Sequence, residues 1–223
     1  MSANHAAFNL IFRFVENYVS PIAGRISSQR HVMAIRDGFI SAMPFMIVGS
    51  FLLVFAYPPF SPDTTWGFAR AWLDMAKQFE GQILTPFDMT MGVMSLYICA
   101  AIAYNLGKHY VKTHQLDPFM CAMLSLMAFL LVAAPKTKGA LPVDSLGGTG
   151  IFTAILVAIY CVEMMRFLKA HNIGIRLPDQ VPPMIKNSFD LLIPVLVVVL
   201  TLYPLSLLIQ SQFGMLIPQA IMS

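Results

Sequence analysis

Charged residues are scarce in this sequence. Asp, Glu, Lys and Arg make up 11% of its 223 residues, whereas hydrophobic residues make up 57% and the mean hydropathy is +0.70. A soluble domain carries roughly 25% charged and about 45–50% apolar residues. A globule of this size cannot bury so much apolar surface, so the composition excludes a soluble enzyme and a disordered chain. The class that remains is a polytopic membrane protein.

Cysteine is equally scarce, which argues against a disulfide scaffold. Cys99, Cys121 and Cys161 each lie in an apolar stretch without a CxxC motif, so we interpret them as small buried hydrophobic residues. The histidines lie outside the apolar stretches, and none has the spacing of a metal site: His5, His31, His109, His114 and His171. We therefore expect no metal and no cofactor. No nucleic-acid-binding motif accompanies the net charge of +3.

Long runs without charge predict the membrane-spanning segments. About 20 apolar residues cross the hydrocarbon core, and a charge at a helix centre costs about 2.5–3.5 kcal/mol. The sequence predicts transmembrane helices near 39–57, 86–107, 118–134, 149–168 and 190–211. The predicted fold class is an all-α, polytopic membrane helix bundle of about five transmembrane helices, which occupies residues 39–223.

The first 38 residues have a different pattern. They lack the short apolar core and cleavage site of a signal peptide. Apolar residues recur at helical spacing on one side: Phe8, Ile11, Phe12, Val15, Tyr18, Val19 and Ile22. Polar residues lie opposite, so residues 1–38 are predicted to hold an amphipathic helix at the membrane surface. A helix packed on a neighbouring domain is the alternative.

The distribution of Lys and Arg predicts the orientation. With the predicted spans, ten of these residues fall on the side of the N-terminus and four on the opposite side. Cytoplasmic loops carry the excess of positive charge. The N-terminus is therefore predicted to be cytoplasmic and, after five spans, the C-terminus external.

Candidate chemistry is sparse. Glu163 is the one carboxylate expected inside a span, where an ionisable group is a functional candidate, and Arg166 one turn later can pair with it. A structural ion pair and a transport role both remain open. The run Gly147–Gly150 lacks the lysine of a P-loop, and we interpret it as a flexible hinge into the fourth span. No nucleophile stands beside a base, so the sequence predicts no catalytic site of its own.

The segment 173–188 is the most distinctive polar stretch. Pro178, Pro182 and Pro183 bias it toward stiff, extended backbone. Polar side chains within it can bond sugar hydroxyls, among them Asp179, Asn187 and Ser188. A rigid connector, with Asn187 or Ser188 capping the last span, is the alternative.

Several sequence blocks resemble a known family. They include HVMAIRDGFISAMPFMIVGSFLLV at 31–54, TMGVMSLYICAAIAYNLGKHY at 90–110, SLGGTGIFTAILVAIYCVEMMRFL at 145–168 and RLPDQVPPMIKNSFDLLIP at 176–194. In this order they resemble the membrane component, enzyme IIC, of the bacterial phosphoenolpyruvate-dependent sugar phosphotransferase system. The lactose/cellobiose/diacetylchitobiose branch is the most similar.

The resemblance implies a function and partners. Such proteins lie in the bacterial cytoplasmic (inner) membrane as homodimers and import a disaccharide, generally β-linked. A IIB subunit, charged by IIA, phosphorylates the sugar. On this basis Asn187 and Ser188 are expected at the periphery of the sugar site.

The length differs from that of the family, whose members have about ten spans. The residues thought to hold and activate the sugar hydroxyl belong to the part of the family without a counterpart here. The expectation is a truncated product, half of a split protein or a remnant. A membrane-interaction module that dimerises without transporting is therefore the alternative to a permease.

Overall fold

A computed structural model of the chain describes residues 15–134, 143–175, 182, 189–214 and 216–222. The regular structure of these residues is entirely helical. The long helices are α3 (Arg30–Ala56), α4 (Gly67–Thr90), α5 (Met94–His114), α6 (Pro118–Ala133), α7 (Ile151–Ala170) and α9 (Leu192–Phe213). The short ones are η1 (Val15–Val19), α2 (Ser20–Ser27), η2 (Gly148–Gly150) and α10 (Ile217–Met222).

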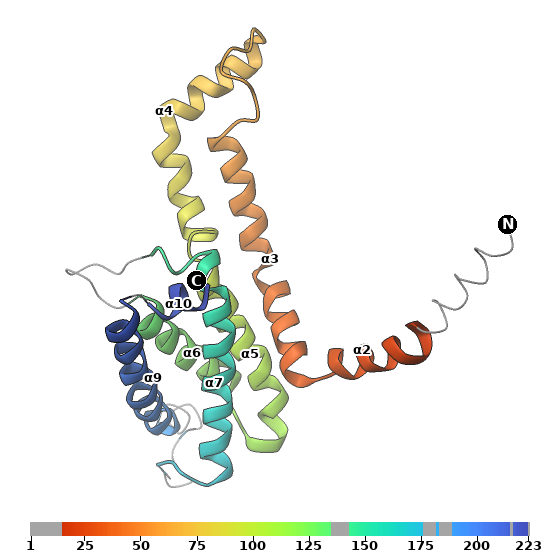
Figure 1. Cartoon of the computed structure of the whole chain (residues 1–223), viewed down its shortest axis with the longest axis vertical. Helices are drawn as coiled ribbons and strands as arrows, with labels where there is room; N and C mark the ends of the chain where they lie inside the picture. The colour runs from red at the N-terminus through yellow and green to blue at the C-terminus, as the bar shows by residue number, and fades with distance from the viewer. Residues whose placement is uncertain (1–14, 135–142, 176–181, 183–188, 215, 223) are drawn as a thin grey trace, which may run out of the picture.

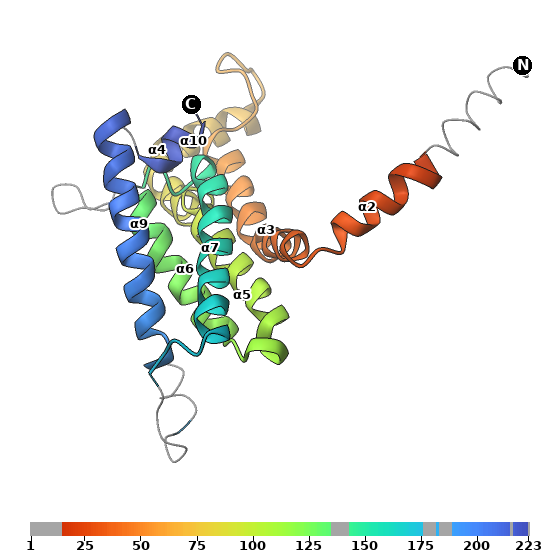
Figure 2. The same ribbon diagram turned by 60° about the horizontal axis from the view of Figure 1, so that its bottom comes forward.

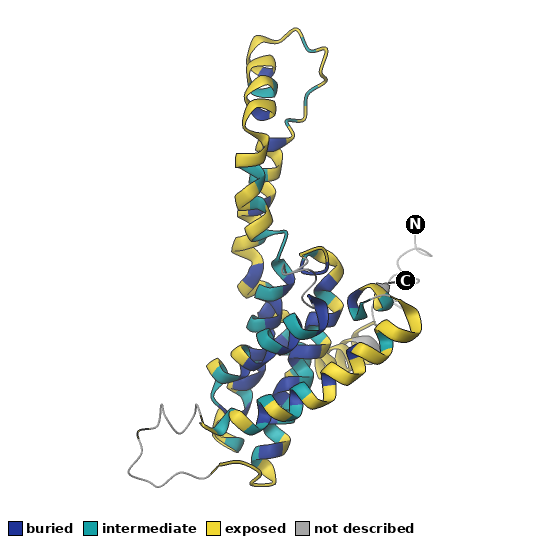
Figure 3. Ribbon diagram, turned by 90° about the vertical axis from the view of Figure 1, so that its left-hand side faces the viewer, coloured by how far each residue is buried: buried dark blue, intermediate teal, exposed yellow. Residues whose placement is uncertain are grey.

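The helix α5 lies at the centre of the bundle, between α3, α6 and α7 (Figure 1). Its inner face carries Ile98, Ile102 and Leu106, which are fully buried. The buried residues gather where these helices meet, as Figure 3 shows. Cys99, Cys121 and Cys161 are free thiols in this core, which confirms their interpretation as buried hydrophobic residues.

The apolar helices confirm the predicted all-α membrane bundle. Four helical stretches are long and apolar enough to cross a bilayer, and they are Arg30–Ala56, Gly67–His114, Gly148–Ala170 and Leu192–Phe213. A fifth apolar helix, Pro118–Ala133, is shorter. The chain enters α6 through Asp117, whose carboxylate accepts hydrogen bonds from the amides of Phe119 and Met120 at 2.8 and 3.3 Å. Together with Pro118 in the first turn, this cap fixes where α6 begins.

The prediction was wrong for the second span. Residues 58–85 were expected to connect two spans, but α4 occupies Gly67–Thr90, and α5 begins only at Met94 after a turn. Charged residues on α4, among them Arg70, Asp74 and Lys77, precede the uncharged run on which the prediction relied, so the prediction did not extend to this helix. An amphipathic helix paired with a neighbour tolerates charge along its outer face.

The helix α4 and the second half of α3 form a hairpin that projects beyond the bundle (Figures 1 and 3). We call residues 50–90 the arm. Aromatic rings cluster at its tip, with centroid separations of 5.5 to 6.0 Å, and they belong to Phe55, Phe60, Trp66, Phe68 and Trp72. The Tyr57 hydroxyl donates a 3.0 Å hydrogen bond to Glu80 across the hairpin, and this bond raises the pKa of Tyr57.

The glycine-rich turn before α7 is packed, which corrects its interpretation as a flexible hinge. Gly150 is buried, and a Cβ at this position would collide with the Ser145 carbonyl and approach the Ser95 hydroxyl to 2.8 Å. Ser95 also donates its hydroxyl and its amide to the Leu146 carbonyl, the amide at 3.0 Å. These contacts fasten the turn to the start of α5.

The N-terminal part of the chain leaves the bundle. Helix α2 has no buried residue and runs outward from the start of α3, as Figures 1 and 2 show from two directions. Residues 1–14 of the predicted amphipathic helix lie outside the described residues. The first spanning helix begins at Arg30 rather than near residue 39, so the last residues of the predicted surface segment belong to α3.

Candidate functional site

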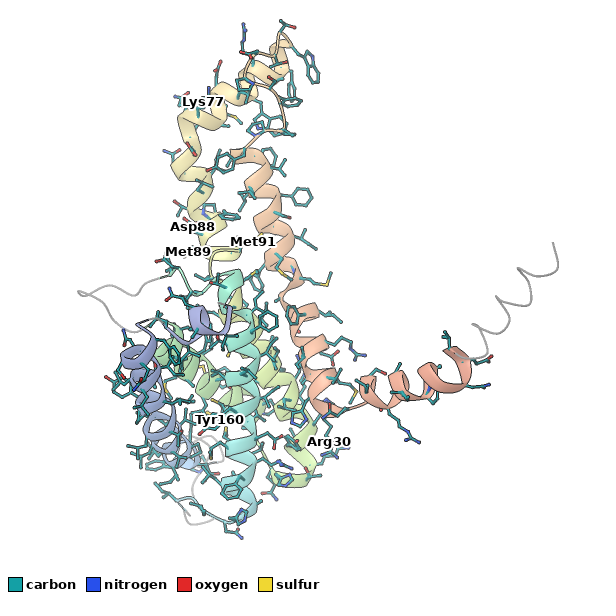
Figure 4. The ribbon with its side chains drawn as sticks, in the orientation of Figure 1. Arg30, Lys77, Asp88, Met89, Met91 and Tyr160 are labelled. Atoms are coloured by element: carbon teal, nitrogen blue, oxygen red, sulfur yellow. The ribbon has the colours of Figure 1, made fainter. Side chains whose placement is uncertain are left out.

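Three helices bring polar side chains together at one end of the bundle. Helix α3 begins at this end, and α5 and α7 finish there (Figure 1). The start of α3 supplies Arg30 and His31, α5 supplies Tyr110, and α7 supplies Glu163 and Arg166. Figure 4 shows Arg30 at the lower end of α3, beside the last turns of α5. We call these five residues the Glu163 network.

The Glu163 carboxylate is the centre of this network. Its Oε1 accepts a 2.7 Å hydrogen bond from the Tyr110 hydroxyl and lies 2.9 Å from Nε2 of His31. Its Oε2 lies 2.6 Å from Nη2 of Arg166, one turn further along α7. The Glu163 side chain is 24% exposed, so these bonds form with limited access to water. One carboxylate therefore joins α3, α5 and α7.

The tautomer of His31 follows from its neighbours. An ionised carboxylate can only accept hydrogen bonds, so Nε2 of His31 carries the proton that it shares with Glu163. The other ring nitrogen, Nδ1, lies 3.4 Å from the Gln29 side-chain amide. The amide nitrogen of Gln29 can donate to Nδ1 when the ring is neutral. A proton on Nε2 and an acceptor at Nδ1 thus satisfy both neighbours of the ring.

Two guanidinium groups lie near the Tyr110 ring. Cζ of Arg166 lies 5.2 Å and Cζ of Arg30 lies 5.6 Å from the ring centroid. Cations near an aromatic face are attracted by its quadrupole, by roughly 0.5–1 kcal/mol at exposed sites. Arg30 thereby connects the beginning of α3 to α5, in addition to the link from His31 through Glu163 to Tyr110.

This arrangement fastens helices to one another. Among the described residues, the groups that contact the Glu163 carboxylate come from α3, α5 and α7 itself, and each donates to it. The network therefore holds three helix ends in register at this side of the bundle.

A cavity of about 520 Å³ lies next to the network. Its lining includes Thr113, His114 and Gln115 at the end of α5, and Lys169 and Asp190. Nζ of Lys169 lies 2.6 Å from Oδ2 of Asp190, and this ion pair ties α7 to the residues that precede α9.

The structure describes some of the predicted site residues and not others. Glu163 and Arg166 form the ion pair just described. Asp179, Asn187 and Ser188, predicted to contact sugar, lie outside the described residues. Among the residues that the structure describes, no group of three or more His, Cys, Asp or Glu side chains could hold a metal ion.

Sequence reasoning missed Arg30, His31 and Tyr110 as members of the network. His31 was placed outside the spans, yet it lies in the first turn of α3 and reaches a carboxylate 132 residues away. Tyr110 is separated from Glu163 by 53 residues. Only spacing within one helix is readable from sequence, so Arg166 was found and these three were not.

Comparisons with known proteins agree on one family. The family described as "Phosphotransferase system, EIIC" matches residues 36–222. The PTS system cellobiose-specific EIIC component of Geobacillus stearothermophilus is 37% identical over 206 residues, which are 84% of this chain and 43% of that protein. The lichenan permease IIC component of Bacillus subtilis is 33% identical over 91% of this chain and 46% of its own length.

A solved structure has the same fold. The transporter ChbC, the IIC component of an N,N'-diacetylchitobiose-specific phosphotransferase system, superimposes with a TM-score of 0.79 at 33% identity. The match covers 94% of this chain and 50% of that one. The chain therefore spans about half the length of the relatives it matches. It is a multi-pass protein of the bacterial inner membrane and belongs to the EIIC family of the phosphotransferase system, in its lactose/cellobiose/chitobiose branch.

Proposed function

We propose that this chain is part of a sugar permease that moves a β-linked disaccharide of the cellobiose, chitobiose or lactose type across the membrane. The observation that carries the proposal is the 37% identity with a cellobiose-specific EIIC component over 84% of this chain. Relatives named for lichenan and for lactose are 33% and 31% identical. Glucose polymers and disaccharides with β-linkages are thus the substrates that the relatives' names suggest.

The partners in this proposal are soluble subunits IIA and IIB, with IIB phosphorylating the sugar as it arrives. One relative from Lactococcus lactis is named a lactose-specific EIICB component, a name that joins both functions in one chain. The chain here contributes the membrane part. The sugar contacts proposed for it remain Asn187 and Ser188, with Asp179 nearby in sequence, on the strength of the family resemblance.

Within this permease the Glu163 network has a mechanical role. It joins α3, α5 and α7 at the end that we propose to be cytoplasmic, where IIB arrives. Helix ends that are held rigidly together give the permease a fixed part, relative to which other parts can move during transport.

The N-terminus is cytoplasmic in this arrangement. An alkaline phosphatase fused after residue 223 should be active and one fused after Gln115 inactive.

The arm supports a homodimer. Large apolar side chains are exposed on it, with Phe51 on α3 62% exposed and Trp66 and Phe68 60% exposed each. A hairpin that projects from its own bundle with such a surface fits against a second copy. The three natural cysteines are buried, so a cysteine introduced on the arm is the accessible thiol. If two copies meet at the arm, Phe51→Cys should form a disulfide-linked dimer on mild oxidation in native membranes. A chain that stays monomeric under these conditions contradicts the dimer.

Uptake in cells tests the transport proposal. The chain is expressed with IIA and IIB in cells without related permeases, alone and together with a segment that corresponds to the rest of a relative's length. Phosphorylated cellobiose or chitobiose should accumulate when the segment is supplied. Absence of phosphorylated sugar in both cases, with the protein present in the membrane, would refute transport and favour the second candidate. That candidate is a non-transporting module that dimerises through the arm.

A further inference from the structure

A groove runs along the outer surface of the bundle, on a face that the Glu163 network does not use. It has a volume of about 330 Å³ and lies between α3, α5 and α6. Its floor comes from one helix and consists of Tyr97, Ala100, Ala101, Tyr104, Asn105 and Lys108 of α5. Ser41 and Phe45 of α3 form one wall, and Ala122 of α6 belongs to the other.

The spacing along α5 explains why the groove exists. Its floor residues recur every three or four positions, so they lie along one face of the helix. Ala100, Ala101 and Ala122 have short side chains, and the surface between the surrounding aromatic rings is therefore hollow. From Tyr97 to Lys108 the helix rises by about 16 Å at about 1.5 Å per residue. This length is about the thickness of the hydrocarbon region of one leaflet, roughly 15 Å.

The two ends of the groove differ chemically. At one end the rings of Phe45 and Tyr97 stack at a centroid distance of 4.3 Å, with an interplanar angle of 9°, and close it with apolar surface. At the other end Nζ of Lys108 lies 4.4 Å from the centroid of the Tyr104 ring, which holds the ammonium at the mouth. Lys108 lies near the end of α5, on the side of the bundle that the charge distribution predicts to be cytoplasmic.

We propose that this groove binds one anionic phospholipid of the cytoplasmic leaflet. The acyl chain lies over the alanines, and the phosphate meets Lys108, with the Asn105 amide and the Tyr104 ring beside it. A long apolar body with one anionic end matches a hollow apolar floor with one cationic end. The cytoplasmic leaflet attracts basic residues near its surface by about 1 kcal/mol for each Lys.

The surrounding charges favour an anion at this end. Lys112 lies one turn further along α5, and His109 follows Lys108 directly. Asp37 on α3 already pairs with Arg36 at 2.8 Å, and the Asp117 carboxylate at the start of α6 caps that helix. The basic residues Lys108, Lys112 and Arg36 therefore outnumber these two carboxylates. A lipid phosphate supplies the missing negative charge while remaining at the level of the headgroups.

A helix from a second copy fits this groove less well. Small residues do permit close helix packing in membranes. A helix lying over Ala101, however, would cover the neighbouring Lys108 and remove its ammonium from water, at a cost that a carboxylate would have to offset. A lipid avoids this cost because its charged headgroup stays at the membrane surface.

Photolabelling of the purified full chain tests the proposal. The probe is phosphatidylglycerol with a photoreactive group on its acyl chain, added in mixed micelles, and the label is located by peptide mapping. We expect labelling between Tyr97 and Lys108 that unlabelled phosphatidylglycerol displaces more effectively than phosphatidylcholine. Lys108→Gln should weaken phosphatidylglycerol binding about fivefold. Lys108→Arg should retain it.

Two further variants separate the groove from general surface charge. Lys112→Gln removes the same charge one turn away, outside the groove lining, and should leave labelling within about twofold of the unaltered chain. Ala101→Leu fills the floor and should abolish it. Lys108 is exposed, so Lys108→Gln tests the site even where Ala101→Leu disturbs folding. Unchanged binding in Lys108→Gln, or equal displacement by phosphatidylcholine, would overturn the proposal. So would cross-linking between two copies through Ala101→Cys in native membranes.

Discussion

Replacing Glu163 by glutamine should loosen the end of the bundle where α3, α5 and α7 meet. The substitution keeps the size and shape of the side chain but removes its charge. One amide oxygen can still accept from Tyr110 or His31, whereas the ion pair of 2.6 Å with Arg166 is lost. Glu163→Gln thus tests the charge of the network and not merely the volume of the residue.

The expected loss lies between two limits. Removing one partner of a fully buried ion pair costs about 3–5 kcal/mol, and an exposed pair contributes about 0–1 kcal/mol. The side chains of Glu163 and Arg166 are 24% and 41% exposed, so this pair lies between those limits. Hydrogen bonds between membrane helices average about 0.6 kcal/mol. We expect Glu163→Gln to lower the free energy of unfolding by about 2 kcal/mol, which is roughly a 30-fold change in the unfolding equilibrium.

The buried thiols provide the assay. Cys99, Cys121 and Cys161 lie in the core on α5, α6 and α7, so their reaction with a maleimide reports opening of the bundle. Tryptophan fluorescence is less suitable, because Trp66 and Trp72 both lie in the arm. Labelling rates are measured at increasing SDS fractions in mixed detergent micelles. Extrapolation to zero SDS then gives the free energy.

The matched control is Asp37→Asn, which removes one negative charge from an exposed pair with Arg36. It should change the free energy of unfolding by less than about 1 kcal/mol. The reasoning is refuted if the two substitutions have equal effects. It is also refuted if His31→Ala and Glu163→Gln are simply additive, because contacting residues should couple by at least about 0.5 kcal/mol.

Three further substitutions, one of them with a matched control, test how the bundle is built. Gly38→Ala should destabilise the bundle by about 2 kcal/mol in thermal unfolding, because the added Cβ would lie 2.9 Å from the Ile102 backbone nitrogen. The control is Gly81→Ala in the arm, where the added Cβ meets no atom within 4 Å, and it should be neutral or stabilising in the same measurement. Asp117→Ala should cost about 1 kcal/mol through loss of the α6 cap, with a lower unfolding midpoint in SDS as the measurement. The Ser95 hydroxyl donates to the Leu146 carbonyl in the turn before α7. Ser95→Ala should therefore lower the free energy of unfolding by about 1 kcal/mol and increase proteolysis of that turn. Unchanged cleavage would contradict the view that Ser95 holds the turn in place.

The membrane-spanning architecture was largely readable from the sequence. A bilayer excludes charge so strongly that uncharged runs locate most of the spans, and α6, α7 and α9 lie within a few residues of their predicted positions. The same rule failed for α4, which carries charged residues along its length. The charged face of α4 hid a helix that its pairing with α3 stabilises. The hydropathy of the α4 sequence alone contains no information about its packing against α3.

The Glu163 network shows the limit most clearly. The ion pair with Arg166 depends on the repeat of one helix and could be proposed from the sequence. The bonds to His31 and Tyr110 depend on how α3 and α5 pack against α7, which no local spacing encodes. The groove beside Lys108 has the same origin, since its floor is one helix face but its walls come from two others. The sequence by itself determined which segments enter the membrane, because burial in lipid is a property of each segment. The tertiary structure alone decided which polar groups meet, because contact is a property of pairs of helices.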